Sequence, residues 1–507
     1  MTSSIRLLPS ASAALLALSL LAGCAVGPAF VKPETPSPPD WNTWRSGDAS
    51  LAVPPPRVDA LPQDWWRLFN DPVLTQLEQR ALQASPDLQT AALHYAQARV
   101  QRRASEAQGW PSLNLGGGIT RRRDSEWGPG TRIIDAITPN RQPLIDILSQ
   151  PYTDYQVGFD ASWELDLWGR VARSLDAADA DTASQAALLR SAQLSVASEV
   201  ARNYFELRTT QRQVRLARED IAALSDRLGL LQARVDAGAL DHFDLDRQRA
   251  ELDGVKAQLP PLLAQEAASA NQIALLLGEH PGALRDTLAP VPAAAQDAQA
   301  ALPDLSVGIP SEVAQRRPDI QAAEASLRKA TANIGVATAE LYPSVRIGAK
   351  FGYDSYLDSE FGTWASRTWS IGPSFDLPLF DHGRRKSVVA LRELQQQEAA
   401  INFQRTVLKA WQEIDDAFSG YAAERQQAER LAARMASARS AYQLAQARYD
   451  GGTVDYTAVL DSQRSYLQAR RDLAGSQGRL SARYVAVNKA IGNVPQATDT
   501  VVGAAGE

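Results

Sequence analysis

The residue that stands out for its possible chemistry is Cys24, because it is the only cysteine among 507 residues. A lone thiol excludes an intrachain disulfide. No nucleophile, base and orienting group can be proposed together, so we expect neither an enzyme nor a cofactor. The four histidines are also too scattered to form a plausible metal cluster with this thiol: His94, His242, His280 and His382. The role of Cys24 therefore has to be sought in the residues around it.

The segment before Cys24 has the layout of an export signal. A basic start at Arg6 is followed by an apolar stretch over residues 7–21 and by the small residues Ala22 and Gly23. This stretch is too short for a stable transmembrane helix, which needs roughly 20 apolar residues. We therefore predict that residues 1–23 are a signal peptide and are removed.

The sequence Leu-Ala-Gly-Cys at 21–24 resembles the lipobox of bacterial lipoproteins. The resemblance implies that Cys24 carries an S-diacylglyceryl group and an N-palmitoyl group after cleavage. Several acyl chains hold a protein stably at a membrane, whereas one chain gives only marginal binding. In such lipoproteins an aspartate after the cysteine usually marks retention in the inner membrane, and here Ala25 follows, which favours the outer membrane. The alternative is an ordinary secretory signal with an incidental cysteine.

The mature chain is acidic. The whole sequence has a formal net charge of −6, and loss of Arg6 with the signal makes it more negative still. This charge argues against a nucleic-acid partner, which calls for a basic patch. Beyond the signal, no apolar run approaches the length of a membrane-spanning helix. Residues 24–63 are rich in proline and lack periodicity, so we predict a lipid-anchored extended tether.

The rest of the chain repeats itself. SPDLQTAA at 85–92 returns as RPDIQAAE at 317–324, and WPSLNLG returns as YPSVRIG at the same spacing. Matches further along the chain share a second, shorter spacing, and this change predicts a longer loop before Tyr155 in the first half. We divide the chain into two structural repeats, 64–290 and 291–495, and a C-terminal tail, 496–507.

Each repeat contains segments in which apolar and polar residues alternate, the pattern of β-strands. YQVGFDASWEL, from Tyr155 to Leu165, is apolar at every second residue, and SVRIGAKFGYD and WSIGPSFDLPL alternate similarly. With a weaker fourth segment, these strands predict β-hairpins at about 112–165 and 344–379. Pro373 cannot donate to a strand ladder and is expected to mark a bulge. The strand lengths suit tilted bilayer-crossing strands, although the edge of a soluble sandwich would alternate in the same way.

Long heptad patterns follow each β-hairpin. Apolar residues at steps of three and four run from Arg170 to Asp236 and from Arg384 to Asp450, and further seams return at multiples of seven. The sequence therefore predicts two long helical hairpins, at about 169–278 and 384–492. Their turns are marked by glycines that can end a helix and by aspartates that can cap the next one: Gly238 and Asp241, then Gly452 and Asp455.

Four strands cannot form a membrane sheet alone, because the sheet edges would leave backbone groups without hydrogen-bond partners. The smallest common single-chain barrels have about eight strands. We therefore expect chains to share one barrel, and three chains with four strands each would close a twelve-stranded barrel. The predicted fold class is an α+β membrane protein with an internal two-fold repeat, a long α-helical coiled-coil barrel and a trimer-shared transmembrane β-barrel.

Several motifs together resemble the TolC-like outer-membrane factors, specifically the NodT-type efflux lipoproteins. They are the lipobox continuing as CAVGP, WWRLFNDPVLTQL at 65–77, WELDLWGR at 163–170, GIPSEVAQRRPDIQAAE at 308–324, PLFDHGR at 378–384 and LDSQRSYLQA at 460–469. The resemblance implies a homotrimeric channel-tunnel in the outer membrane of a Gram-negative bacterium, extending into the periplasm. It also implies a passive exit duct for drugs or other small molecules. The implied partners are a periplasmic adaptor protein, an inner-membrane RND-type transporter and outer-membrane lipid.

The same resemblance implies a periplasmic gate near the hairpin tips, whose four turn residues are expected to contact the adaptor. Asp461 and Arg464 match family positions where gate residues occur, and a spacing of three places them on one helix face. Asp246 and Arg249 have the same spacing in the first half. The alternative for these charges is ordinary solvated helix surface. Alternatives for the whole chain are a non-conducting lipid-anchored periplasmic coiled-coil scaffold and the exit duct of a type I secretion system.

Overall fold

The computed structural model describes residues 25–34, 36–41, 43–52, 64–128, 131–132, 134, 140–238, 241–291 and 310–495. They form two compact units. The strand unit contains the described parts of Met1–Val31, Arg99–Asp181 and Leu327–Ala399, and the hairpin unit those of Lys32–Ala98, Thr182–Ser326 and Ala400–Glu507. Each unit takes segments from both sequence repeats, so the two repeats are not separate compact bodies.

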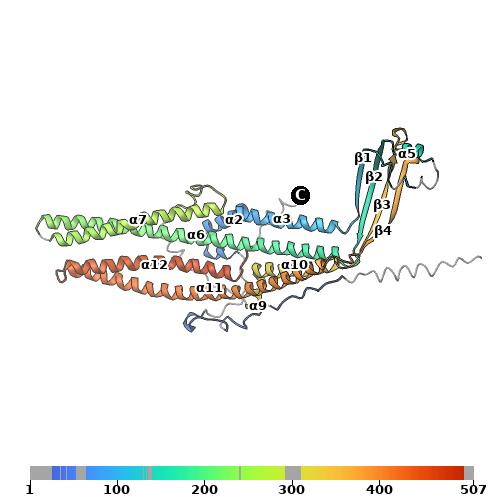
Figure 1. Cartoon of the computed structure of the whole chain (residues 1–507). Coiled ribbons are helices and arrows are strands. Elements are labelled where there is room, and N and C mark those ends of the chain that lie inside the picture. The colour runs from blue at the N-terminus through green and yellow to red at the C-terminus, as the bar shows by residue number, and fades with distance from the viewer. Residues whose placement is uncertain are drawn as a thin grey trace, which may run out of the picture. The chain divides into compact units, whose positions relative to one another are not determined.

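The strand unit is built on one antiparallel sheet with the strand order β1-β2-β3-β4 (Figure 1). The pairing of β2 with β3 joins the two predicted β-hairpins into this single sheet. All four predicted strands are confirmed: β1 covers Ser112–Arg122, β2 Tyr152–Leu165, β3 Ser344–Ser355 and β4 Arg367–Asp376.

The register gathers apolar residues of all four strands on one face of the sheet. Leu115 lies opposite Phe159, Phe159 opposite Phe351, and Phe351 opposite Trp369. Leu115 is 65% exposed and Trp369 is 70% exposed, so no described part of the chain covers this row on the outer strands. A contiguous apolar surface of this kind marks a contact with lipid or with another protein.

Two local features differ from the sequence-based expectations. Pro373 pairs with Ile347 in an unbroken register, so the expected bulge is wrong. β4 is an edge strand within the chain, and proline is tolerated at an edge position whose nitrogen faces away from the neighbouring strand. The predicted long loop between β1 and β2 contains a short helix, α5, Gln142–Leu148. The shorter β3–β4 connection holds two 3-10 turns, η3 at Asp358–Glu360 and η4 at Trp364–Ser366.

Two long helical hairpins, most of whose residues belong to the hairpin unit, run side by side (Figure 1). The first consists of α6, Arg170–Asp236, and α7, His242–Leu276, and the second of α11, Arg384–Asp450, and α12, Tyr456–Ala490. α6 and α11 cover the ranges over which the heptads run, and at 1.5 Å per residue each is about 100 Å long. Both hairpins begin and end at equivalent positions of the repeat, so the sequence repeat extends to the helix boundaries. Within the described ranges, none of the helices is apolar over enough of its length to cross a membrane.

The remaining helices are short, and several of them complete the core of the hairpin unit. The main apolar cluster joins η2 (Trp65–Phe69) and α2 (Pro72–Ala84) to α6, α7, α11 and α12, and Tyr204 is among its most deeply buried side chains. α2 begins after Asp71, whose carboxylate accepts hydrogen bonds from the backbone of Val73 and Leu74. The short elements are η1, Ala49–Leu51; η2, Trp65–Phe69; α2, Pro72–Ala84; α3, Pro86–Ala107; α9, Pro310–Arg316; and α10, Pro318–Ala339.

Part of the predicted tether is attached to the folded body. The ring of Trp41 packs against Phe418 of α11 at 5.1 Å, and Trp411 Nε1 donates a hydrogen bond to the backbone carbonyl of Pro36 at 3.1 Å. Ser46 Oγ donates to Asp415 Oδ2 at 2.9 Å. The described residues of 36–52 therefore form a strap along α11 rather than a free linker.

Candidate functional site

The hairpin tips contain the turn residues that the sequence singled out. Gly238 and Gly452 have φ values of 69° and 70°, the left-handed conformation predicted for them. Asp241 caps α7 as expected, because its carboxylate accepts a hydrogen bond from the backbone N–H of Phe243 at 3.3 Å. Asp455 precedes α12, but its side chain accepts no capping hydrogen bond, so this detail of the prediction is wrong.

The start of α12 is held by packing instead. Tyr456 is 3% exposed, and its hydroxyl donates a hydrogen bond to Gln248 Oε1 on α7 at 3.1 Å. Leu231 and Leu245 of the first hairpin join Tyr456 and Val459 of the second in one apolar cluster. The two tips are therefore attached to each other through a shared core, and a helix cap at Asp455 is not needed.

The gate candidates of the second repeat make their charged contacts to the other hairpin. Asp461 and Arg464 lie on the same helix but form no ion pair with each other: Asp461 Oδ1 is 3.5 Å from Arg247 Nη2, and Arg464 Nε is 2.5 Å from Glu251 Oε2. Both partners belong to α7, so these charges connect the two hairpins. Arg247 and Asp461 occupy equivalent positions of the two repeats, 214 residues apart.

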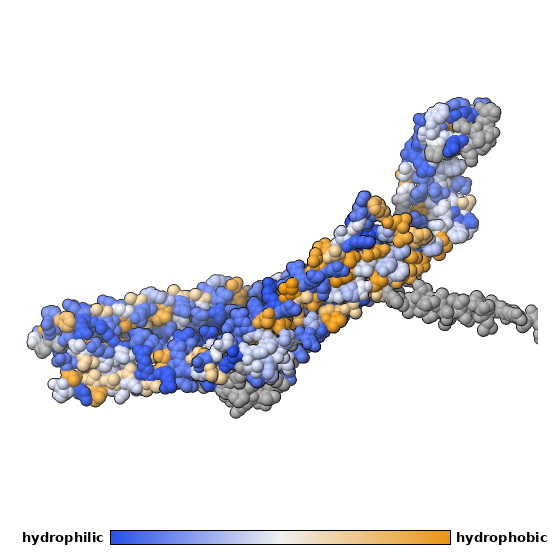
Figure 2. Space-filling model, turned by 60° about the horizontal axis from the view of Figure 1, so that its bottom comes forward, coloured by the Kyte–Doolittle hydropathy of each residue, from blue (hydrophilic) through white to orange (hydrophobic). Residues whose placement is uncertain are grey.

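Asp246 and Arg249, the gate candidates of the first repeat, contact each other, as their spacing of three residues on one helix allows. Arg249 Nη1 lies 3.2 Å from Asp246 Oδ1, and Arg249 also donates a hydrogen bond to Gln232 of α6. Asp246 and Asp461 remain 69% and 61% exposed. Exposed ion pairs contribute only about 0–1 kcal/mol each, so the contacts at the tips are weak individually. Most of the face of the hairpins drawn in Figure 2 is hydrophilic.

Reasoning from the sequence missed Arg247 and Glu251. Arg247 could have been found from the sequence, because it occupies the position in the first repeat that Asp461 occupies in the second. No comparable signal exists for Glu251, which contacts Arg464 across a separation of 213 residues. That contact depends on how the two hairpins are rotated against each other.

A second charged contact joins the hairpins farther from the tips. Asp220 of α6 is only 2% exposed, and its two carboxylate oxygens lie 3.2 Å from Arg470 Nη1 and 3.3 Å from Arg471 Nη1. Burial raises the pKa of Asp220, while the two guanidinium groups act in the opposite direction. Removing one partner of a buried ion pair strongly destabilises the fold, because the other charge is left buried and unpaired. This contact therefore holds α12 against α6.

Two further predictions concern modification and metal binding. Cys24 lies outside the described residues. Within the part of the chain that the structure describes, no group of three or more His, Cys, Asp or Glu side chains could hold a metal ion.

Comparisons with known proteins extend over most of the chain. A family model described as outer membrane efflux protein matches residues 77–279 and 309–493. The chain is 30% identical over 456 residues to outer membrane protein OprJ of Pseudomonas aeruginosa, covering 90% of this chain and 89% of that protein. It is 26% identical over 456 residues to the probable outer membrane lipoprotein SilC of Salmonella typhimurium, covering 90% and 92%. The solved structure of the outer-membrane channel OprN matches with a TM-score of 0.80 and 29% identity, covering 93% of this chain and 99% of that one.

Proposed function

Because this chain belongs to the outer membrane efflux protein family, we propose that it forms the outer-membrane channel of a tripartite efflux pump. In this role it is a passive exit duct. It receives drugs or other small molecules from a periplasmic adaptor and an inner-membrane RND-type transporter and releases them to the exterior. The observation that carries the proposal is the sheet of four strands, which has an exposed apolar face and a polar face.

The sheet alone cannot be stable in hydrocarbon, because no water is present there to satisfy its edges. Three copies of the chain would place β1 of one beside β4 of the next and close a barrel of twelve strands. The apolar row that contains Leu115 and Trp369 would then face lipid. The opposite face carries Asp160 and Lys350, 3.6 Å apart, which suit a water-filled lumen.

Purified full-length protein tests this proposal directly. In mild detergent we expect a trimer, and in planar bilayers we expect discrete ion conductance. A monomer that leaves membranes without detergent and conducts no ions would instead support the non-conducting scaffold. Loss of efflux in a strain lacking this chain, with the adaptor and transporter present, would be the cellular counterpart.

The lipid anchor is a separate part of the proposal. The similarity to SilC, a probable outer membrane lipoprotein, supports acylation of Cys24. Intact-mass spectrometry of the mature protein should find the acyl groups, and a Cys24→Ser variant should lack them. A mature wild-type chain with an unmodified thiol would contradict the assignment.

The gate is the third part. We expect three copies of Asp461 to narrow the closed tip, because like carboxylates around one axis attract cations and constrict the mouth. Asp461→Ala should raise the single-channel conductance in planar bilayers above that of the wild type. Glu429→Ala is a matched control, since Glu429 is a 70% exposed carboxylate on α11 in a pair with Arg425. If Asp461→Ala and Glu429→Ala have equal conductance, Asp461 is not a gate residue.

A further inference from the structure

The residues directly after Cys24 lie in the strand unit, against the turn between β2 and α6. The backbone N–H of Val26 donates a hydrogen bond to the backbone carbonyl of Trp168 at 3.1 Å. Ala25 lies so close to Gly169 that a Cβ added to Gly169 would be 2.7 Å from Ala25 Cβ. The motif CAVGP therefore has contacts of its own in the folded chain, and neither the channel nor acylation by itself accounts for them.

Gly27 makes a second close contact, on the side of α10. Its φ is 94°, a conformation that residues with a Cβ rarely adopt. A Cβ added to Gly27 would be only 2.5 Å from Gly335 Cα of α10. A Cβ at Gly335 would in turn be 2.8 Å from Arg173 Cγ. Residue 27 therefore has to be glycine both for its conformation and for its space.

Trp168 connects these contacts to the two middle strands of the sheet. It follows the end of β2, and its Nε1 donates a hydrogen bond at 2.8 Å to the carbonyl of Pro343, which directly precedes β3. Its ring stacks on Tyr342, with centroids 4.8 Å apart and an angle of 23° between the planes. β2 belongs to the first repeat and β3 to the second. Residues 25–27 are therefore attached at the point where the two repeats join.

The internal repeat supplies a comparison for this site. Gly383 is equivalent to Gly169, and its φ of 83° is close to the 76° of Gly169. However, a Cβ added to Gly383 would meet no atom within 4 Å. At the position of Gly335, the first repeat has Arg103 on α3. The positive φ is thus a property of the strand–helix turn in both repeats, whereas the close approach at Gly169 depends on the N-terminal segment.

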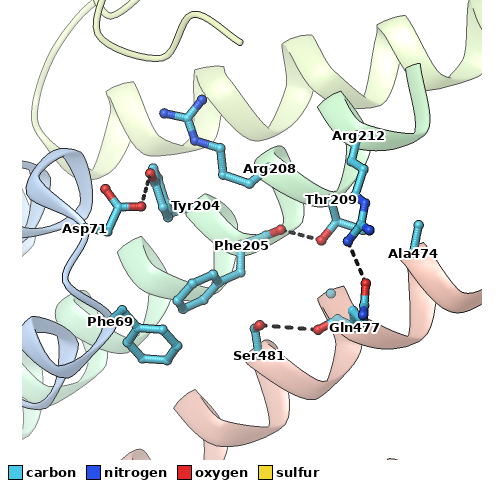
Figure 3. Close-up of a pocket in the computed structure, with 11 residues that line it drawn as sticks. Phe69, Asp71, Tyr204, Phe205, Arg208, Thr209, Arg212, Ala474, Gln477 and Ser481 are labelled. Carbon is cyan, nitrogen blue, oxygen red and sulfur yellow. Dashed lines mark hydrogen bonds between the residues drawn. The ribbon is translucent and has the colours of Figure 1, made fainter. Parts of the chain in front are cut away.

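Farther along, the N-terminal region is attached through aromatic side chains instead. In Figure 3, Phe69 of η2 lies beside Phe205 of α6 at the edge of a small cavity, and the ring centroids are 4.7 Å apart. Trp41 packs against α11 in a similar way. Residues 25–27 are Ala-Val-Gly and have no aromatic side chain. Their attachment therefore depends on the backbone hydrogen bond and on the two close approaches at glycine.

We propose that residues 25–27 are a docking segment. Their seat consists of the Trp168 carbonyl, Gly169 and Gly335. Because the acylated cysteine directly precedes this segment, the seat holds the lipid-bearing end of the mature chain beside the ends of β2 and β3. The docked segment also holds the joint between these strands together and so stabilises the assembled barrel. The position of the acyl chains and the effect on the barrel rest on the proposed function, whereas the docking itself does not.

Hydrogen exchange at the Val26 amide tests the docking. The parent is the full-length chain in detergent with Cys24→Ser and a signal peptide cut before residue 24, because its N-terminal peptic peptide then carries no acyl chains. Gly27→Ala should accelerate exchange at Val26 at least about tenfold relative to this parent, since overlap with α10 releases the segment. Val31→Ala, at an 81% exposed position, should leave the exchange unchanged.

The two equivalent glycines give a matched comparison on the side of the seat. Gly169→Ala should accelerate exchange at Val26, because its Cβ would displace Ala25. Gly383→Ala introduces a Cβ at a similar positive φ without such a contact and should have no effect. Fast exchange at Val26 in the parent, slow exchange in Gly27→Ala, or equal exchange in the two seat variants overturns the docking.

The acylated chain tests the effect on the barrel. Gly27→Ala should lower the temperature at which the trimer dissociates on gels, while intact-mass spectrometry still finds the acyl groups. An unchanged dissociation temperature overturns the role in stabilising the barrel. A chain whose Val26 amide is protected but which is neither acylated nor trimeric would refute the proposed function and leave the docking in place.

Discussion

Glu78 provides the sharpest test of how the hairpin unit is stabilised. It lies on α2 with 0% exposure, and no side chain in the described residues forms an ion pair or hydrogen bond with its carboxylate. Burial raises the pKa of Glu78 well above its usual value of 4.5; the backbone N–H of Ala201 acts in the opposite direction, and the nearby charge of Asp64 in the same direction as burial. The folded protein therefore holds this carboxyl group in its neutral form at a pH where the unfolded chain has already ionised it.

The sign and size of the effect follow from proton linkage. A folded-state pKa above the unfolded value means that the stabilisation is fully present below the unfolded pKa. It is lost as the pH rises through the folded pKa. Within this window the free energy of unfolding falls by about 1.4 kcal/mol per pH unit for one such group. Glu78→Gln removes the titration, so within this window the variant should gain about 1.4 kcal/mol relative to the wild type for each pH unit.

Thermal unfolding of the full-length protein in detergent, followed by tryptophan fluorescence, is a suitable assay. The difference in midpoint between Glu78→Gln and the wild type should increase in favour of the variant as the pH rises above 4.5, the ordinary pKa of a glutamate. Glu398→Gln on α11 changes an exposed glutamate and should run parallel to the wild type. A Glu78→Gln difference that does not vary with pH would refute the neutral, buried carboxyl.

Three further substitutions test the packing. Gly478→Ala should destabilise the hairpin unit by about 1–3 kcal/mol in the same unfolding assay, because the added Cβ would lie only 2.7 Å from Thr209 Cβ; a stabilised variant would contradict this close approach. Gly352→Ala should reduce the yield of detergent-stable trimer on unheated gels, because the added Cβ would overlap the backbone of β2. Gly348→Ala is the control: its added Cβ would meet no atom within 4 Å, so this variant should assemble normally. Asp220→Asn should lower the free energy of unfolding by roughly 3 kcal/mol, since two arginines would lose their buried carboxylate; an unchanged midpoint would show that the ion pair is not needed.

The elements and their faces could be predicted from the order of the residues alone. The heptads predicted α6 and α11 over the ranges that the structure shows, and alternation predicted the strands whose apolar sides share one face. Gly238 and Gly452 were identifiable as helix-ending glycines. These features can be predicted because periodicity and turn chemistry are properties of neighbouring residues, and both occur in each of the two repeats.

The contacts between side chains required the folded chain. Asp461 pairs with Arg247 and Arg464 with Glu251, each across the two hairpins, and Asp455 leaves the start of α12 to the packing of Tyr456. The burial of Glu78 and Arg208 was equally hidden, because nothing in their local patterns distinguishes them from surface charges. Such contacts depend on the rotation and axial position of one helix against another, and these are set by the packing of the whole core rather than by any single stretch of sequence.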